Sequence, residues 1–200
     1  MRTSIFIDFD WLAARLPSKG RVLDVGCGVG SLDYEIARSN QRLSVLGIDL
    51  SSQSIDAARR YNSLPNIEYE CKSLDSVEGE FDCIIFVDVF HHIPPAEHPG
   101  LLAKSARLLA AGGYLLIKDI ERKKGHLGLW LDRYVSGCEE VYLYNCEELV
   151  ATVSKHMRVR KSEVRFRFPF PHYYIEAVNP SREEASSGAM KGEAATNRRR

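Results

Sequence analysis

The stretch RVLDVGCGVGS, residues 21–31, decides the fold of this chain. The run VLDV has the pattern of a short buried strand, with Asp24 as its only charged residue. Gly26, Gly28 and Gly30 follow at alternate positions. Glycines spaced this closely at the end of a strand indicate a turn in which the backbone comes close to another group.

Outward from this turn, apolar strands alternate with amphipathic helices. Strands are expected at residues 21–25, 43–50, 66–74, 81–90 and 114–120, and helices at 8–17, 31–39, from Ser51 onward, and between Pro95 and Gly112. In the first helix the expected apolar face consists of Phe9, Leu12, Ala13 and Leu16. This alternation is typical of βαβ units and predicts a parallel sheet with helices on both faces.

The pattern changes after residue 120. Residues 121–146 combine a helix-like stretch with an aromatic one, and we expect them to form an insertion, followed by a helix at 146–156. The segments EVRFRFPF and HYYIEAV, within 163–178, look like an antiparallel pair. Residues 179–200 carry almost nothing apolar, so we expect a disordered tail.

The composition indicates one globular domain, which we place at residues 1–178 with a helical segment at 1–19. The 27 basic side chains are balanced by 27 acidic ones, so the formal net charge is zero. A chain without net charge has no global field that would attract a polyanion. Nucleic acid is therefore disfavoured as a partner.

The cysteines and the N-terminus bear on the compartment. Five scattered cysteines without a C-x-x-C pair indicate reduced thiols, and neither a zinc site nor a disulfide framework is expected. The first residues carry acids where a signal peptide has an apolar core. No apolar run approaches the roughly 20 residues that span a bilayer. We expect a cytoplasmic protein without a transmembrane segment or a metal ion.

The order of the glycines distinguishes two kinds of nucleotide site. The dinucleotide motif G-x-G-x-x-G would need its third glycine at position 31, where the chain has Ser31. The observed order resembles instead the cofactor-binding turn of the class I S-adenosylmethionine-dependent methyltransferases. FDCIIFVDVFHHIP resembles the fourth strand of that family with its following loop, and LLAAGGYLLIKD resembles its helix, glycine turn and fifth strand.

The resemblance covers about residues 20–120, and the hairpin at 163–178 fits the last two strands of the family. It implies an α/β fold: a Rossmann-like three-layer α/β/α sandwich with a mostly parallel seven-stranded sheet and an antiparallel C-terminal hairpin. It also implies that the insertion at 121–146 lies on the substrate side.

The resemblance further implies S-adenosylmethionine as the cofactor. In this family the glycines let the backbone approach the methionyl part, and an acid after the second strand holds both ribose hydroxyls. Asp49 stands at that position, and a carboxylate suits a diol because it accepts two O–H bonds. The implied cofactor residues are Asp24, Gly26, Cys27, Gly28, Gly30, Asp49, Leu50, Ser73, Leu74, Val87 and Asp88.

Several of these positions have two interpretations. Asp24 either contacts the cofactor, directly or through water, or caps amides of the turn. Many family members place an acid next to the adenine amino group, at a position that falls near Ser73 here. Asp75, two residues later, is a second candidate or a solvated loop acid. Cys27 is interpreted as a small side chain that fills the turn, because no neighbour in sequence would lower its pKa.

Candidate catalytic residues follow the fourth and fifth strands: His91, His92 and Asp119. A histidine can act as a general base near neutral pH, or it can pack against the cofactor loop. Adjacent residues point in different directions, so at most one histidine faces the substrate. Asp119 either accepts a substrate proton or pairs with Lys118, and Asp88 has a similar position.

Aromatic residues concentrate after the fifth strand, where the family builds its substrate walls. They are Trp130, Tyr134, Tyr142, Tyr144, Phe166, Phe168, Phe170, Tyr173 and Tyr174. Half or more of them are expected in the core, and the rest suit a flat or apolar acceptor. Arg165 and Arg167 alternate with Phe166 and Phe168, which predicts a solvated outer face for the arginines.

The predicted reaction is methyl transfer by in-line displacement to a small-molecule acceptor. An amine acceptor would not need a general base for this reaction. The loop VDVFHHIPP lacks the [DNS]-P-P-[YFW] motif common in purine and glutamine N-methyltransferases. Three alternatives stay open: a catalytically silent partner subunit of the same fold, a macromolecular methyltransferase whose partner recruits the substrate, and a nicotinamide-dependent oxidoreductase. A monomer or a homodimer is expected.

Overall fold

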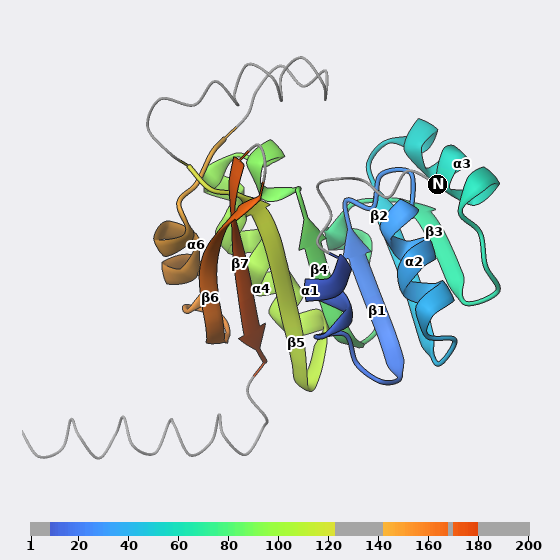
Figure 1. Ribbon diagram of the computed structural model, residues 1–200, viewed down its shortest axis with the longest axis horizontal. Coiled ribbons are helices and arrows are strands. Elements are labelled where there is room, and N and C mark those ends of the chain that lie inside the picture. The colour runs from blue at the N-terminus through green and yellow to red at the C-terminus, as the bar shows by residue number, and fades with distance from the viewer. Residues whose placement is uncertain (1–8, 123–141, 168–169, 180–200) are drawn as a thin grey trace, which may run out of the picture.

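The computed structural model of the protein describes residues 9–122, 142–167 and 170–179 (Figure 1). Residues 1–8 of the expected N-terminal segment, most of the expected insertion and nearly all of the expected tail lie outside the described residues. So do Trp130, Tyr134 and Phe168. The expectations for these residues stay predictions.

The described strands form one mixed sheet in the order β3-β2-β1-β4-β5-β7-β6. Five of them run parallel, and β7 lies antiparallel between β5 and β6. The strands are β1 (Gly20–Val25), β2 (Leu43–Asp49), β3 (Ile67–Cys71), β4 (Phe81–Val87), β5 (Leu109–Ile120), β6 (Arg158–Arg167) and β7 (Phe170–Val178). The predicted mostly parallel sheet with an antiparallel C-terminal pair is confirmed.

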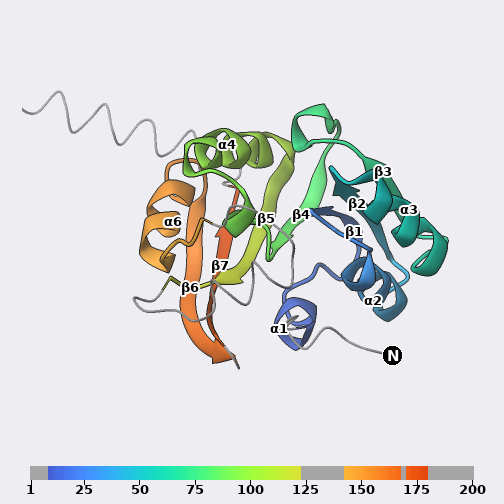
Figure 2. The same cartoon turned by 90° about the horizontal axis from the view of Figure 1, so that it is seen from above.

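Helices cover both faces of the sheet, which makes three layers (Figure 2). One face carries α1 (Phe9–Ala13), α2 (Ser31–Ser39) and α3 (Ser52–Tyr61), and the other carries α4 (His98–Leu108) and α6 (Cys146–Val153). Short 3₁₀ turns follow the strands at η1 (Leu74–Ser76), η2 (Phe90–His92) and η3 (Pro95–Glu97).

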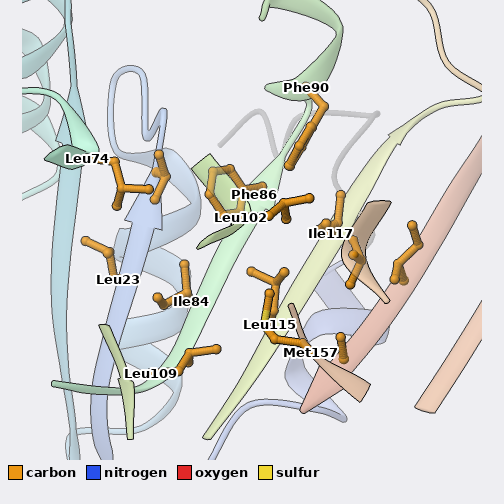
Figure 3. Close-up of a cluster of buried hydrophobic side chains, with 14 of the residues drawn as sticks. Leu23, Leu74, Ile84, Phe86, Phe90, Leu102, Leu109, Leu115, Ile117 and Met157 are labelled. Carbon is orange, nitrogen blue, oxygen red and sulfur yellow. The ribbon is translucent and has the colours of Figure 1, made fainter. Parts of the chain in front are cut away.

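Three clusters of buried apolar side chains hold these layers together, and two of them are large. The larger lies between the sheet and helices α4 and α6, where Phe86, Leu102 and Ile117 are fully buried (Figure 3). The second lies under α1 and α2 and includes Ile36 and Tyr174. Burial of each such side chain contributes about 1.5–3 kcal/mol. The cores therefore fix the carboxyl ends of the strands, from which the functional loops start.

Two helices begin where the sequence supplies a cap. The Ser51 hydroxyl accepts a hydrogen bond from the Ser54 amide at 3.2 Å at the start of α3. At the start of α6, the Asn145 side chain accepts from the Glu148 amide at 2.8 Å, and the Glu148 carboxylate accepts from the Asn145 amide. These bonds satisfy amides that the first helical turn leaves without partners.

Some boundaries differ from the prediction. Helix α4 ends at Leu108 rather than at Gly112, because Leu109 already pairs with Phe81 and a register shift follows in β5. Strand β6 begins at Arg158, earlier than the predicted 163. In α1 the expected face is partly wrong, since Ala13 is exposed and Trp11 is buried against Tyr174, with ring centroids 4.9 Å apart.

Candidate functional site

A cavity of about 850 Å³ opens at the carboxyl ends of the parallel strands. In open α/β sheets this edge is where ligands bind. The predicted site residues on its wall are Gly26, Asp49, Leu50, Ser73, Leu74, Asp88 and His92. Its wall also includes Asp75, which the sequence analysis named beside Ser73 as the second candidate for the adenine contact.

The glycine turn forms one side of this cavity. The amides of Gly26 and Cys27 both donate to the Ile48 carbonyl, at 2.8 and 3.0 Å, which ties the turn to the end of β2. Gly26 has a φ of 78°, and a Cβ atom there would lie 2.7 Å from a methyl carbon of Val89. A side chain at this position is therefore excluded by backbone conformation and by space.

Asp49 is held rigidly beside the turn. One carboxylate oxygen accepts from the Gly28 amide at 2.9 Å, and the other accepts from the Ser51 amide at 2.8 Å. The next residue, Leu50, lines the cavity with 77% of its surface exposed. A fixed carboxylate next to an exposed apolar side chain suits a ligand that has both hydroxyl groups and a flat apolar part.

The loop after β3 contributes the 3₁₀ turn η1. Leu74 is buried, whereas Ser73 and Asp75 are exposed on the cavity wall. Lys104 of α4 donates to the Asp75 carbonyl at 3.0 Å, which links this turn to α4. Both candidates for the adenine contact therefore lie at the cavity, and the choice between them stays open.

Asp88 follows β4 in a left-handed conformation, with a φ of 57°. The ammonium group of Lys118, which is buried, donates to both of its carboxylate oxygens at 2.6 and 2.7 Å. Burial raises the pKa of Asp88 to about 6, although the Lys118 charge opposes the shift. The sequence analysis gave an ion pair between Lys118 and Asp119 as one alternative. In the structure, Lys118 pairs with Asp88 instead.

The three catalytic candidates separate into one exposed residue and one buried pair. His92 lines the cavity. His91 lies behind it, with its ring centroid 3.8 Å from that of His92, and its Nδ1 is 2.6 Å from an Asp119 carboxylate oxygen. Burial alone would raise the pKa of Asp119, but the His91 charge and hydrogen bond outweigh it and hold that pKa below its usual value.

Other predicted residues are not on the cavity wall: Asp24, Cys27, Gly28, Gly30 and Val87, together with His91 and Asp119. Burial raises the pKa of the Cys27 thiol, and the nearby carboxylates add to the shift, which agrees with a filling role. Asp24 is buried next to Asp33, a residue that the sequence analysis did not single out. An acid in the first turn of a helix is common, so its position in the sequence carried no signal.

The wall also has members that were not predicted. They come from strand ends, from the loop after β3 and from the segment that enters α4: Val25, Ile48, Ser51, Lys72, Val89, Ile93, Ala96, Glu97, Gly100, Leu101 and Arg107. The Pro94–Pro95 step was recognised only as the start of a helix. Its neighbours Ile93 and Ala96 line the wall, which depends on tertiary packing of α4 against η1.

In the described part of the chain, none of the aromatic residues singled out from the sequence lines the cavity, so their role in a substrate wall stays a prediction. Tyr173 and Tyr174 are buried in the cores, whereas Phe166 is 70% exposed on β6. Arg165 is exposed and its guanidinium carbon lies 5.5 Å from the Tyr174 ring centroid, on the opposite strand face from Phe166. The side chains of Arg167 and Phe170 lie outside the described residues.

The described residues contain neither a metal-binding cluster nor a membrane-spanning helix. No three histidine, cysteine, aspartate or glutamate side chains are grouped there in a way that could hold a metal ion. No helix among those residues has the length and apolar character needed to cross a membrane.

The chain is similar to known proteins in sequence and in structure. Residues 22–113 match a protein family described as a methyltransferase domain. A ubiquinone biosynthesis O-methyltransferase of Thiobacillus denitrificans is 34% identical over 119 residues, which cover 56% of this chain and 50% of that protein. A cyclopropane-fatty-acyl-phospholipid synthase of Escherichia coli is 30% identical over 122 residues, which cover 59% of this chain and 32% of that protein.

Among solved structures, magnesium protoporphyrin IX methyltransferase from Synechocystis, determined with bound S-adenosylhomocysteine, is similar with a TM-score of 0.67. The two chains are 23% identical, and the match covers 85% of this chain and 78% of that one. At this identity the likeness concerns the fold. The chain spans half or less of the length of the curated relatives described above.

Proposed function

We propose, on the premise that residues 22–113 of this chain belong to the class I S-adenosylmethionine-dependent methyltransferases, that the protein transfers a methyl group from S-adenosylmethionine to a small-molecule acceptor. One observation carries the proposal. The Asp49 carboxylate is held at the cavity wall by the glycine turn and by the start of α3, as a ribose-binding acid requires.

The other cavity residues fit this cofactor in their chemistry. Asp49 would accept bonds from the ribose hydroxyls, and Gly26 leaves space for the methionyl part because it has no side chain. Leu50 and Leu74 offer apolar surface to the adenine ring, and the Ser73 hydroxyl can bond to its polar edge. A cavity of about 850 Å³ is within the usual range for ligands of this class.

The cofactor would supply a methyl group that its sulfonium already activates. A bond from the acceptor lone pair to the methyl carbon would form while the carbon–sulfur bond breaks, and that electron pair would stay on sulfur. The main contribution of the chain is to hold the acceptor in line with the breaking bond. Such orientation lowers a barrier by roughly 7–11 kcal/mol relative to a bimolecular encounter.

We assign the general base to His92, since it lies on the cavity wall and His91 and Asp119 lie behind it. A hydroxyl acceptor loses a proton during transfer, and an imidazole nitrogen of His92 would take it. The hydrogen bond between His91 and Asp119 fixes the His91 ring, against which His92 packs. His91 and Asp119 are positioning residues in this proposal.

The proposed acceptor is a flat or apolar small molecule with a hydroxyl group. Support comes from the relative named as a ubiquinone biosynthesis O-methyltransferase and from the candidate base on the wall. The loop VDVFHHIPP, without a motif for planar amides, also favours such an acceptor. A lipid-linked acceptor is a variant, supported by the relative that is named as a fatty-acyl-phospholipid synthase.

The competing functions are weighed by particular residues. A catalytically silent partner subunit is disfavoured because the glycine turn and Asp49 are both intact. A nicotinamide oxidoreductase is disfavoured by Ser31 and by the antiparallel β6–β7 pair. A macromolecular substrate recruited by a partner protein would be revealed by copurification. The cytoplasmic location and the monomeric or homodimeric state remain predictions.

Calorimetric titration of the protein with S-adenosylmethionine, S-adenosylhomocysteine and NADH tests the proposal. We expect micromolar binding of both sulfur compounds and no heat with NADH. Binding of NADH alone would overturn the family-based function. Absence of binding by all three would favour the silent partner subunit, and copurifying proteins would then be identified.

A further inference from the structure

Two acidic side chains meet in the interior beneath the glycine turn. Asp24 lies near the end of β1 and Asp33 lies in the first turn of α2, with 3% and 0% of their surfaces exposed. Neither carboxyl oxygen of Asp33 has a donor from another group. In the part of the chain that the structure describes, no lysine, arginine or histidine side chain bonds either carboxyl.

The neighbouring strand is shaped to admit this pair. Gly47 of β2 is the register partner of Asp24. A Cβ atom on Gly47 would lie 2.6 Å from an Asp33 carboxyl oxygen and 2.8 Å from a ring carbon of Tyr69. Any larger residue would push Asp33 away from the sheet. The glycine is therefore the reason that the two carboxyls can be adjacent.

Two buried carboxyls in contact cannot both be ionised without a cation. Burial raises the pKa of Asp24 to about 7, and it raises the pKa of Asp33, which the Asp24 charge raises further. The groups around the pair are also acidic or neutral: Asp49 from the end of β2, Cys27 from the turn, Tyr69 from β3 and Cys83 from β4. The pair consequently holds one proton between its two carboxyls near neutral pH.

The pKa of this pair depends on charge in the cavity. Asp49, which lines the cavity, adds to the rise in the pKa of Asp24 through its negative charge. By the same interaction with opposite sign, a cation beside Asp49 lowers that pKa. Occupation of the cavity and protonation of the pair are therefore linked.

We propose that Asp24 and Asp33 form a proton-sharing pair that releases its proton to solvent when a cationic ligand enters the cavity and regains it when the cation is lost. The inference rests on the proposed function, in which the entering ligand carries a sulfonium and the product carries a neutral thioether. Release leaves both carboxylates ionised beneath the positive ligand. The pair would thus favour the charged methyl donor over the spent product, with Asp33 as a positioning residue.

The test is calorimetric titration at pH 6, 7 and 8, each in two buffers with different ionisation enthalpies. The wild-type protein should release a fraction of a proton with S-adenosylmethionine, and less with S-adenosylhomocysteine. In Asp33→Asn the amide replaces the shared proton, so this release should disappear. Protons that the ligand itself exchanges contribute equally in both proteins, so the difference in proton release between wild type and variant excludes them.

The affinities provide a second readout. Between pH 6 and pH 8, the affinity of the wild type for S-adenosylmethionine should rise by up to about tenfold relative to that of Asp33→Asn. Asp56→Asn is the matched control, because that acid is exposed on α3, and it should behave as wild type. Equal proton release by wild type and Asp33→Asn would overturn the inference.

Two results distinguish a failure of this inference from a failure of the proposed function on which it rests. Binding of S-adenosylmethionine without proton release contradicts only the proton-sharing pair, whereas no binding contradicts the proposed function and the linkage together. If Asp33→Asn does not fold, NMR titration of carbon-labelled aspartate carboxyls in the wild type replaces it. A carboxyl that titrates near neutral pH and shifts on ligand addition supports the pair; aspartates that all titrate near pH 4 overturn it.

Discussion

Asp49 and Asp24 are both acids at the carboxyl ends of neighbouring strands, and their surroundings give them different chemistry. Asp49 receives two backbone amides and faces the cavity. Asp24 has another acid as its neighbour and is buried. Two amide donors stabilise a carboxylate, whereas a buried acid neighbour favours a shared proton. The residue type alone therefore does not determine the role.

The role of Asp49 leads to a prediction for cofactor affinity. Asp49→Ala removes the acceptor for the ribose hydroxyls and also the bonds to Gly28 and Ser51. We expect S-adenosylmethionine to bind more weakly by about 1–3 kcal/mol, as measured by calorimetry. Asp56→Ala, an exposed acid of α3 that is not on the cavity wall, is the control for general effects of charge. Unchanged affinity in Asp49→Ala would contradict the site.

The proposed base gives a kinetic prediction. Once an acceptor is known, His92→Gln should lower kcat by about 10²-fold or more and remove the rise of the rate with pH, while cofactor affinity stays near that of wild type. His156→Gln, away from the cavity, is the control and should have wild-type kinetics. A His92→Gln enzyme with normal kcat would leave the chain with a positioning role only.

Residues of the site could be predicted only where the motif is local. Gly26, Asp49 and His92 each directly follow a strand whose pattern is clear, and all three lie at the cavity. Asp33 could not be predicted, because its importance depends on Gly47 in another strand. A glycine within an apolar strand was the one available signal, since it indicates a close approach by another group.

At the scale of elements, the two capped helices differ in how many bonds their caps supply. Asn145 and Glu148 form a reciprocal pair at α6, and Ser51 supplies a single bond of 3.2 Å at α3. Both caps come from side chains adjacent in sequence to the helix they start. The helices therefore begin at residues that the sequence identifies without knowledge of the fold.

These caps predict a ranking of stabilities. Asn145→Ala should lower the free energy of unfolding by about 1–2 kcal/mol, and Ser51→Ala by about 0.5–1 kcal/mol. Urea denaturation of each variant measures the difference. Glu147→Ala is the control, since this exposed residue lies in the same first turn of α6 outside the capping box. A larger loss from Ser51→Ala than from Asn145→Ala would contradict the comparison.

Most elements of the α/β core were predictable because apolar periodicity and turn residues act within short windows. The predicted end of α4 was wrong, because the contacts that end this helix lie outside such a window. Leu109 joins the sheet by pairing with Phe81, and the Asn179 side chain donates to the carbonyls of Ala106 and Leu109. Those partners are distant in sequence, so the boundary depends on tertiary contacts that a local pattern does not contain.

For the whole molecule, the buried acids produce opposite dependences of stability on pH. The folded-state pKa values of Asp24 and Asp33 lie above their unfolded values, near 3.9, so the folded state binds more protons between about pH 4 and pH 7. The free energy of unfolding falls as the pH rises through that range. Asp119 acts in the opposite direction, because its stabilisation is lost as the pH falls below about 4.

The prediction is a stability maximum at about pH 4. Urea denaturation should give a free energy of unfolding about 2–4 kcal/mol lower at pH 8 than at pH 5 for the wild type. Asp33→Asn should lose most of that difference and should be the more stable protein at pH 8. Parallel pH profiles for wild type and variant would show that the acid pair does not contribute.

The position of β7 inside the sheet has a consequence for synthesis on the ribosome. Among the described strands β7 is the last to be made, yet it lies between β5 and β6 and bonds to both. A nascent chain that ends before residue 170 therefore exposes two unpaired strand edges, which are sites for aggregation. Completion of this sheet must wait for β7, and nonsense truncation within β7 should yield insoluble protein rather than a weakened enzyme.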